Sequence, residues 1–207
     1  MILEIISIAV ILFFAVVLHE YAHGWVAYKL GDPTAKLAGR LTLNPVRHVD
    51  PVGTIFLPGV LIALRFLGLN TFLFGWAKPI PVNFSRLNNP RRDMMLVGMA
   101  GPAVNVVLAV VASQLTRVPM PVDVYKFVEA AVFINLLLAA FNMIPIPPLD
   151  GSRLVMGLLP RGLAVPYSQL ERYGILIVMV FIYMGVLDAV VLPVVEWAGR
   201  LLGVQFS

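Results

Sequence analysis

Three residues near the start of the chain have the types and the spacing of a metal-binding helix. The stretch AVVLHEYAHGWVAY, residues 15–28, contains His19 and His23 four positions apart, with Glu20 beside the first of them. On a helix the two imidazoles would lie on one face, one turn apart, where they can bind the same ion. Glu20 would then be close enough to accept a proton from an attacking water molecule. This H-E-x-x-H spacing is typical of zinc hydrolases, so it predicts hydrolysis at a metal centre.

A third protein ligand has to come from another part of the chain, because a catalytic zinc usually has three protein ligands and one water. The chain contains three histidines and no cysteine, so this ligand is either the remaining histidine, His48, or a carboxylate. Asp150 is the leading carboxylate, since it follows the apolar stretch FNMIPIPPL, in which prolines interrupt the helix and free backbone groups to face a site. An aspartate followed by glycine is also common in ordinary turns. The residues alone rank Asp150 before His48 and leave both open.

The metal motif lies within an apolar run, and the composition of the whole chain indicates why. Hydrophobic residues make up 60% of the 207 residues and charged residues only 13%, with a mean hydropathy of +0.91. Soluble domains carry about 25% charged residues, so we expect an integral membrane protein. Ionisable groups inside a spanning helix are costly and usually functional. The net charge of +4 is distributed between the apolar runs, which favours cytoplasmic loops over a nucleic-acid surface.

The apolar runs predict an all-α polytopic membrane protein with about four spanning helices. A bilayer core of about 30 Å needs about 20 apolar residues, and the runs that meet this condition are residues 2–28, 94–116, 127–146 and 173–197. The first run has no basic segment before it, so we expect it to be retained rather than cleaved as a signal peptide. Extended loop elements are expected near the site, where KPIPVN disfavours helix. We expect a single domain over residues 1–207.

The segment 52–76 is apolar but contains glycines, a proline and an arginine, so it is either kinked or re-entrant. The metal site constrains this choice. His19 and His23 lie in the second half of the first run and Asp150 follows the third, so these ends must share one membrane face to meet at one ion. A single crossing by 52–76 would separate them, whereas a re-entrant or doubly crossing segment brings them to the same face.

The positive charges agree with the re-entrant arrangement. It places eleven Lys and Arg residues in the loops on the metal-facing side and three on the opposite side, whereas a crossing segment leaves no bias. By the positive-inside rule, the N-terminus is then outside and the active site faces the cytoplasm. We therefore expect a multi-pass protein of the cell (inner) membrane.

Three motifs of the chain, taken together, resemble the site-2 protease family of intramembrane zinc metalloproteases. They are HEYAH at 19–23, AGPAVN at 100–105 and FNMIPIPPLDG at 141–151, in the order in which the family has them. This combination is far more specific than H-E-x-x-H alone. The stretches GDPTAKLAGRLTLNPVRHVDPVGT and FGWAKPIPVN are similar to a compact prokaryotic branch of the family, and we expect neither a PDZ nor a CBS domain.

The resemblance implies a zinc-dependent endopeptidase that hydrolyses peptide bonds within or next to the transmembrane segments of membrane proteins. It implies one Zn²⁺ per chain, with His19, His23 and Asp150 as ligands and Glu20 as the catalytic base. The partners are then a membrane-protein substrate and the lipid bilayer, without nucleic acid, while the oligomeric state stays open. The alternative is a non-hydrolytic metal-binding membrane protein or transporter, in which Glu20 would be dispensable.

Four further residues are implied near the site. Gly101 and Pro102 of the AGPAVN motif are expected to pack next to it. Asn105, from the same motif, and Asn142 are expected to contact the substrate backbone or the oxyanion. The alternative role of both asparagines is hydrogen bonding between helices.

Overall fold

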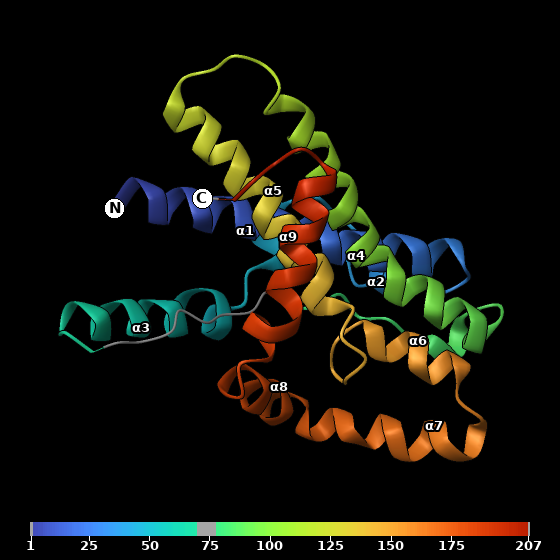
Figure 1. Ribbon diagram of the computed structural model, residues 1–207. Coiled ribbons are helices and arrows are strands. Elements are labelled where there is room, and N and C mark those ends of the chain that lie inside the picture. The colour runs from blue at the N-terminus through green and yellow to red at the C-terminus, as the bar shows by residue number, and fades with distance from the viewer. Residues whose placement is uncertain (1, 70–77, 207) are drawn as a thin grey trace.

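The computed structural model describes residues 2–69 and 78–206, and all regular structure in these residues is helical (Figure 1). Three helices are long and apolar enough to cross a membrane: α1 (Ile2–Lys29), α4 (Pro90–Leu115) and α5 (Val122–Asn142). A fourth crossing exists if the bent pair Leu176–Tyr183 and Leu187–Leu201 is counted as one span. The prediction of an all-α polytopic membrane protein is confirmed.

Shorter helices lie between α1 and α4 and after α5. Before α4 these are α2 (Thr34–Leu37), η1 (Pro45–His48), η2 (Pro51–Phe56), α3 (Leu57–Phe66) and η3 (Phe84–Arg86). After α5 they are α6 (Gly151–Leu158), α7 (Arg161–Ser168), η4 (Gln169–Tyr173), α8 (Gly174–Tyr183), η5 (Leu187–Val191) and α9 (Leu192–Leu201).

The last two predicted spans differ from the observed helices. In place of 127–146, α5 runs from Val122 to Asn142, because the prolines of PIPP cannot continue a helix and disfavour it in the residues before them. In place of 173–197, α8 and the helix after it meet at an angle of 72°. The break contains Gly185, whose φ of 74° ends the first helix.

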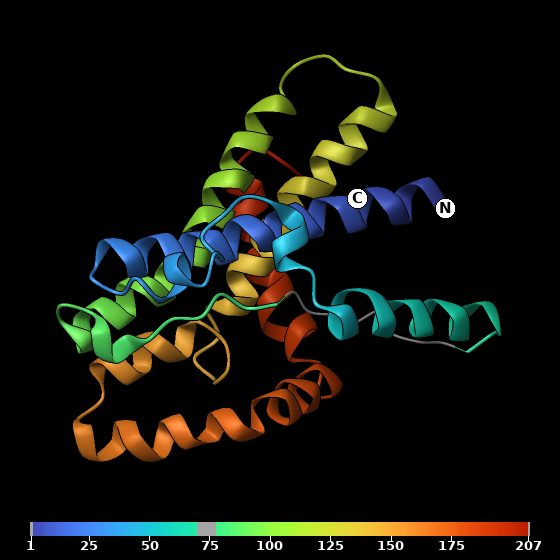
Figure 2. The same cartoon turned by 180° about the vertical axis from the view of Figure 1, so that it is seen from behind.

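The apolar segment 52–76 begins as a helix that leaves the main body, and the described residues that flank it lie next to each other. Its described part continues from η2 into α3, which in both ribbon views extends to the same side as the N-terminal half of α1, away from α4 and α5 (Figures 1 and 2). Residues 70–76 lie outside the described part. Where the chain is described again, the Lys78 N–H donates to the His48 carbonyl oxygen at 2.9 Å. Both flanks of the segment therefore lie together, as a re-entrant segment requires.

Among the three long helices, α4 lies in the middle and makes extensive contacts with both α1 and α5. One buried apolar cluster joins α4 and α5 to η5, α9 and the residues after α9, and it consists of Ala109, Val132, Leu136, Val191, Val195 and Val204. A second cluster joins α1 to α5 through Ile11, Ala15 and Ile134. These contacts fix the rotation of α1 about its axis, and with it the direction in which His19 and His23 point.

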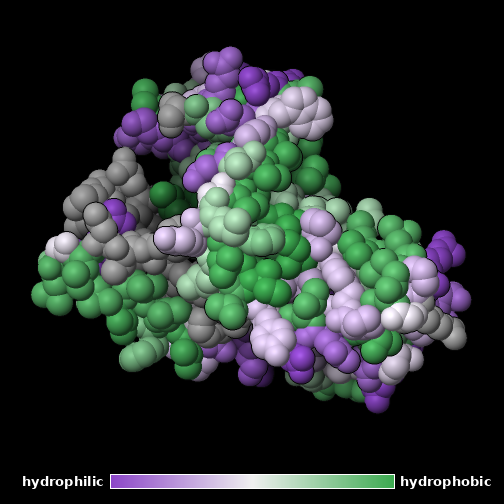
Figure 3. All heavy atoms as spheres, turned by 60° about the horizontal axis from the view of Figure 1, so that its bottom comes forward, coloured by the Kyte–Doolittle hydropathy of each residue, from purple (hydrophilic) through white to green (hydrophobic). Residues whose placement is uncertain are grey.

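Large apolar side chains cover much of the outside of the helices (Figure 3). Phe14 on α1 is 52% exposed, and Val107 and Val111 on α4 are 57% and 58% exposed. Soluble proteins rarely expose apolar surface of this extent. In a multi-pass membrane protein these side chains face lipid.

Candidate metal centre

His19, His23 and Asp150 come together at one point. Within the described residues, they form the one group of three or more His or acidic side chains that could hold a metal ion. The Nε2 atoms of His19 and His23 lie 2.9 and 3.2 Å from the Asp150 Oδ2 atom, and 3.0 Å from each other. The two histidines share one face of α1, and Asp150 immediately precedes α6.

This donor set fits zinc in number, type and spacing. Two imidazole nitrogens and one carboxylate oxygen correspond to the three protein ligands of a catalytic zinc site. Ligand atoms bound to tetrahedral zinc at about 2.0–2.1 Å are about 3.3 Å apart, and the observed separations of 2.9–3.2 Å are only slightly shorter. The Asp150 side chain is 19% exposed, against 7% and 11% for the histidines. Water therefore reaches the group from the side of the carboxylate.

Asp150 offers an ionised carboxylate to this group. Burial would raise the pKa of Asp150, but His19 and His23, when their Nε2 atoms carry protons in place of a metal ion, lower it to about 2 through hydrogen bonds and charge. The carboxylate is therefore deprotonated at neutral pH, which is the form that binds a divalent cation.

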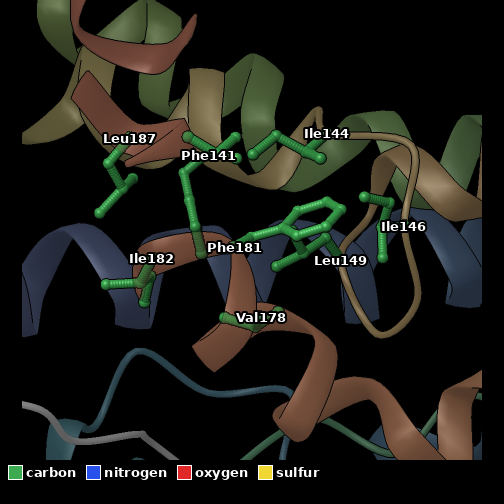
Figure 4. A pocket seen from close by; sticks show the side chains of 9 residues that line it. Phe141, Ile144, Ile146, Leu149, Val178, Phe181, Ile182 and Leu187 are labelled. Atoms are coloured by element: carbon green, nitrogen blue, oxygen red, sulfur yellow. The ribbon is translucent and has the colours of Figure 1, made fainter. Parts of the chain in front are cut away.

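The loop that carries Asp150 is held by an apolar seam on its other side. Ile144, Ile146 and Leu149 face Val178 and Phe181 of α8 (Figure 4). The cavity between them measures only about 10 Å³, so the seam is almost filled. The loop therefore packs against α8 through these apolar side chains, while Asp150 at its end contacts the two histidines of α1.

Both imidazoles are oriented by acceptors at their Nδ1 atoms. His23 Nδ1 lies 2.6 Å from the Val97 carbonyl oxygen, and His19 Nδ1 lies 2.6 Å from the Asn105 Oδ1 atom. A carbonyl oxygen accepts but cannot donate, so each Nδ1 carries the proton in the neutral ring. Each Nε2 then presents its lone pair to the metal position, as second-shell partners of metal-binding histidines generally ensure.

The Asn105 side chain is itself oriented by a second asparagine. Its Nδ2 donates to the Asn135 Oδ1 at 2.9 Å and, more weakly, to the Ala15 carbonyl oxygen at 3.4 Å. Asn135 in turn donates from Nδ2 to the Ala131 carbonyl oxygen at 2.9 Å. Two main-chain carbonyls therefore define which end of each amide is the nitrogen, and the Asn105 oxygen has to face His19.

The substrate or oxyanion contact predicted for Asn105 stays a prediction. Its side chain is fully buried, and both ends of its amide are occupied by His19, Asn135 and Ala15. These contacts are hydrogen bonds between helices, which is the alternative role. Asn135 was not identified from the sequence. It could have been found as an amide within an apolar spanning helix, where polar groups need hydrogen-bond partners.

Gly101 and Pro102 lie on the face of α4 that meets the histidines. Both are buried. A Cβ atom at Gly101 would lie 2.4 Å from the His23 Nε2 and 2.5 Å from the His19 Nε2. Because real Cβ atoms do not approach so closely, the two rings can occupy their positions only against a glycine.

Glu20, the next residue after His19, is partly buried. Its Oε2 accepts a hydrogen bond of 2.8 Å from the Ile80 N–H, which belongs to the extended chain before η3. The extended element predicted from KPIPVN is thus present and contacts the residue predicted to be the base. The contact itself was not predicted.

The two remaining candidates are not part of the three-residue group. His48 is fully buried, and its Nε2 lies 2.8 Å from the Thr42 carbonyl oxygen. Of the two candidates for the third ligand, Asp150 is the one that lies beside His19 and His23. Asn142 ends α5, and its Nδ2 donates to the Leu138 carbonyl oxygen one turn earlier at 2.9 Å. The predicted contact of Asn142 with the substrate stays a prediction.

Comparisons with known proteins find a peptidase family and relatives whose names describe zinc metalloproteases. A family model described as Peptidase family M50 matches residues 118–186, which include Asp150. The "Putative zinc metalloprotease YwhC" of Bacillus subtilis is 38% identical over 195 residues, which cover 88% of this chain and 82% of that protein. The "Putative zinc metalloprotease Rip2" of Mycolicibacterium smegmatis is 30% identical, covering 87% and 68%. That of Mycobacterium tuberculosis strain H37Rv is 29% identical, covering 91% and 71%. No solved structure matches the chain.

Proposed function

The chain belongs to Peptidase family M50, the site-2 protease family, and on that premise we propose that it cleaves membrane proteins within or next to their transmembrane segments. Membership makes it a zinc metalloendopeptidase, and its apolar helices make it a multi-pass membrane protein. The proposed substrate class follows from the position of the metal group in the fold.

One observation carries the proposal: the histidines of the metal group lie on a helix that is long and apolar enough to span a membrane. The candidate span covers Ile6–Lys29, and His19 and His23 lie in its second half. Peptide bonds that reach this centre belong to chain segments at or below the membrane surface. A transmembrane helix engages its peptide groups in its own hydrogen bonds, so the substrate has to unwind locally before it is cleaved.

We assign the chemistry to four residues. His19, His23 and Asp150 hold the ion, which when bound supplies a Lewis acid that activates water and polarises the scissile carbonyl group. Glu20 accepts the proton of the attacking water and returns it to the leaving amine. Glu20 is adjacent to His19 in the sequence. Its Oε2 atom accepts from the Ile80 N–H, so we assign the proton transfer to its other oxygen, Oε1.

The active site is proposed to face the cytoplasm, as part of one domain over residues 1–207. Support comes from the positive charges of the loops on the metal-facing side and from the contact between His48 and Lys78, which brings the ends of the apolar segment together.

The proposal is tested with Glu20→Gln in purified protein reconstituted with membrane-protein substrates. Glu20→Gln should retain one zinc per chain, because the three ligands are intact, and should lose at least about a hundredfold in cleavage rate, as expected for removal of a general base. Glu196→Gln, the same exchange at an exposed position of α9, is the matched control and should cleave normally. Unchanged cleavage by Glu20→Gln would contradict the assignment of Glu20 as the base. Zinc bound without any cleavage by the unaltered protein would favour a non-hydrolytic metal protein.

A further inference from the structure

An extended segment, residues 78–83, runs along α1 beside the metal-binding motif. It joins the described end of the apolar excursion to η3. Pro79 and Pro81 have no N–H, so Ile80 supplies the one backbone donor among residues 79–81. This donor is the N–H that bonds to the Glu20 carboxylate.

The start of the 78–83 segment is fixed by two groups from the residues between α2 and η2. The His48 carbonyl oxygen accepts from the Lys78 N–H at 2.9 Å. The Arg40 Nη2 atom donates to the Lys78 carbonyl oxygen at 2.6 Å and contacts that of Pro79 at 3.4 Å. On the side of the segment, these bonds use main-chain atoms only.

The end of the segment is fixed by a buried carboxylate. Asp32 is fully buried, and its Oδ2 accepts from the Asn83 N–H at 2.6 Å. Its other oxygen accepts from the N–H and the hydroxyl of Thr34, so both oxygens are engaged. Asp32 follows α1 by three residues and so ties the segment to the helix that carries Glu20.

The middle of the segment is seated against α1 by the Ile80 side chain. Ile80 is 7% exposed and packs on Gly24, one turn after Glu20. A Cβ atom at Gly24 would lie 2.9 Å from the Ile80 Cγ2 atom and 3.3 Å from its Cδ1 atom. The Ile80 N–H therefore reaches the Glu20 carboxylate only because residue 24 has no side chain.

We infer that the 78–83 segment is a positioning element for Glu20, with the Ile80 N–H holding one carboxylate oxygen so that the other faces the attacking water. The inference rests on the proposed role of Glu20 as the base. A free glutamate side chain has several rotamers, and a hydrogen bond from a main chain that is fixed at both ends selects one of them. The segment then acts on the rate of the chemical step rather than on metal binding.

The first test compares Ile80→Pro with Ile80→Ala. Proline removes the N–H and keeps extended backbone, whereas alanine keeps the N–H and removes the side chain, so alanine provides the reference. We expect kcat of Ile80→Pro to be about 10- to 100-fold below that of Ile80→Ala, because small displacements of a reacting group have effects of this size. KM and the zinc content should be the same in both variants.

The second test moves the segment without altering Glu20 or the Ile80 N–H. Gly24→Ala should lower kcat because the new methyl group meets the Ile80 side chain. Combining it with Ile80→Ala removes the two Ile80 atoms that lie closest to the methyl group and leaves the Ala35 Cβ atom at 3.4 Å, so the double variant should recover kcat to about the level of Ile80→Ala alone. A purely structural role would lower the melting temperature without this recovery of kcat. This pair decides the question even if Ile80→Pro does not fold.

Equal kcat values for Ile80→Pro and Ile80→Ala, or no recovery in the double variant, would overturn the inference. Failure of the proposed function is seen separately, as cleavage by Glu20→Gln at the normal rate. An inactive Glu20→Gln together with a normal Ile80→Pro refutes only the positioning role.

Discussion

The two imidazoles of the metal group are oriented by acceptors of different kinds. His23 is bound to a main-chain oxygen, that of Val97, which no substitution removes. His19 is bound to a side chain, Asn105, whose own direction depends on Asn135 and Ala15. The orientation of His19 can therefore be altered by mutation without touching a ligand.

Asn105→Ala should weaken zinc binding by about 10- to 100-fold, the usual effect of losing a second-shell partner of a metal-binding histidine. Without the Asn105 oxygen, the His19 ring loses the acceptor that keeps the proton on Nδ1. Zinc affinity is measured by competition with a chelator in the purified protein. Ser113→Ala is the control, because Ser113 is buried on the same helix but donates only to the Val110 carbonyl oxygen. An Asn105→Ala protein that binds zinc like Ser113→Ala would refute the orienting role.

Among the elements, α6 has a particular importance because Asp150 lies directly before its first residue. Its other end is tied to the start of α4 by Arg91. The Arg91 side chain donates from Nε to the Gly157 carbonyl oxygen at 2.6 Å and from Nη2 to those of Leu158 and Leu159 at 3.0 and 2.6 Å. A cation at the C-terminus of a helix satisfies carbonyl groups that have no partner within the helix.

Arg91→Ala should reduce stability, because three carbonyl oxygens at the end of α6 lose their donor. Since Arg91 is largely exposed, we expect about 1 kcal/mol, which corresponds to a melting temperature lower by about 2–4 °C in a chain of this size. Thermal unfolding in detergent measures it. The adjacent Arg92→Ala removes the same charge from an exposed arginine for which the described residues show no hydrogen bond, so it should leave the melting temperature unchanged. An equal decrease in both variants would attribute the effect to charge and not to the carbonyl contacts.

The elements also explain which parts of the structure could be predicted from the sequence. The pairing of His19 with His23 follows from helical periodicity alone, because residues four apart share a face. The approach of Asp150 depends on tertiary packing, and the residues alone left it open against His48. The hydrogen bond between Asn135 and Asn105 could not be predicted. The apolar residues of α5 are distributed around the whole helix, so the sequence does not indicate which face of α5 contacts α4.

The end of α5 shows a similar limit at the level of helix boundaries. Hydropathy extends the third span to residue 146, whereas α5 ends at Asn142. The prolines that follow end the helix, and the loop they form is what carries Asp150 to the histidines. The bend at Gly185 was not predicted either, because the residues around it remain apolar and hydropathy does not record the direction of a helix.

At the scale of the whole molecule, the polar loops gather around the C-terminal end of α1. The 78–83 segment, α2 and α6 all lie on this side, while the connection between α4 and α5 lies at the far end of these helices (Figures 1 and 2). The contact between His48 and Lys78 keeps the two ends of the apolar excursion on the same side. In a membrane, we expect this arrangement to put the metal group and the loops before α4 on one face and the α4–α5 connection on the other.

Cysteine labelling tests this topology without interference, because the natural chain has no cysteine. We expect Arg47→Cys and Ser85→Cys, both at exposed positions, to react with an impermeant thiol reagent from the cytoplasmic face only. Val118→Cys, exposed in the α4–α5 connection, should react only from the opposite face and is the matched control. The physical reason is that a segment whose two flanks are hydrogen-bonded to each other cannot leave them on opposite sides of a bilayer core about 30 Å thick. Labelling of residues 47 and 85 from opposite faces would mean that the apolar excursion crosses once. His19 and Asp150 could then no longer meet at one ion, so the same result would refute the metal group as well as the topology.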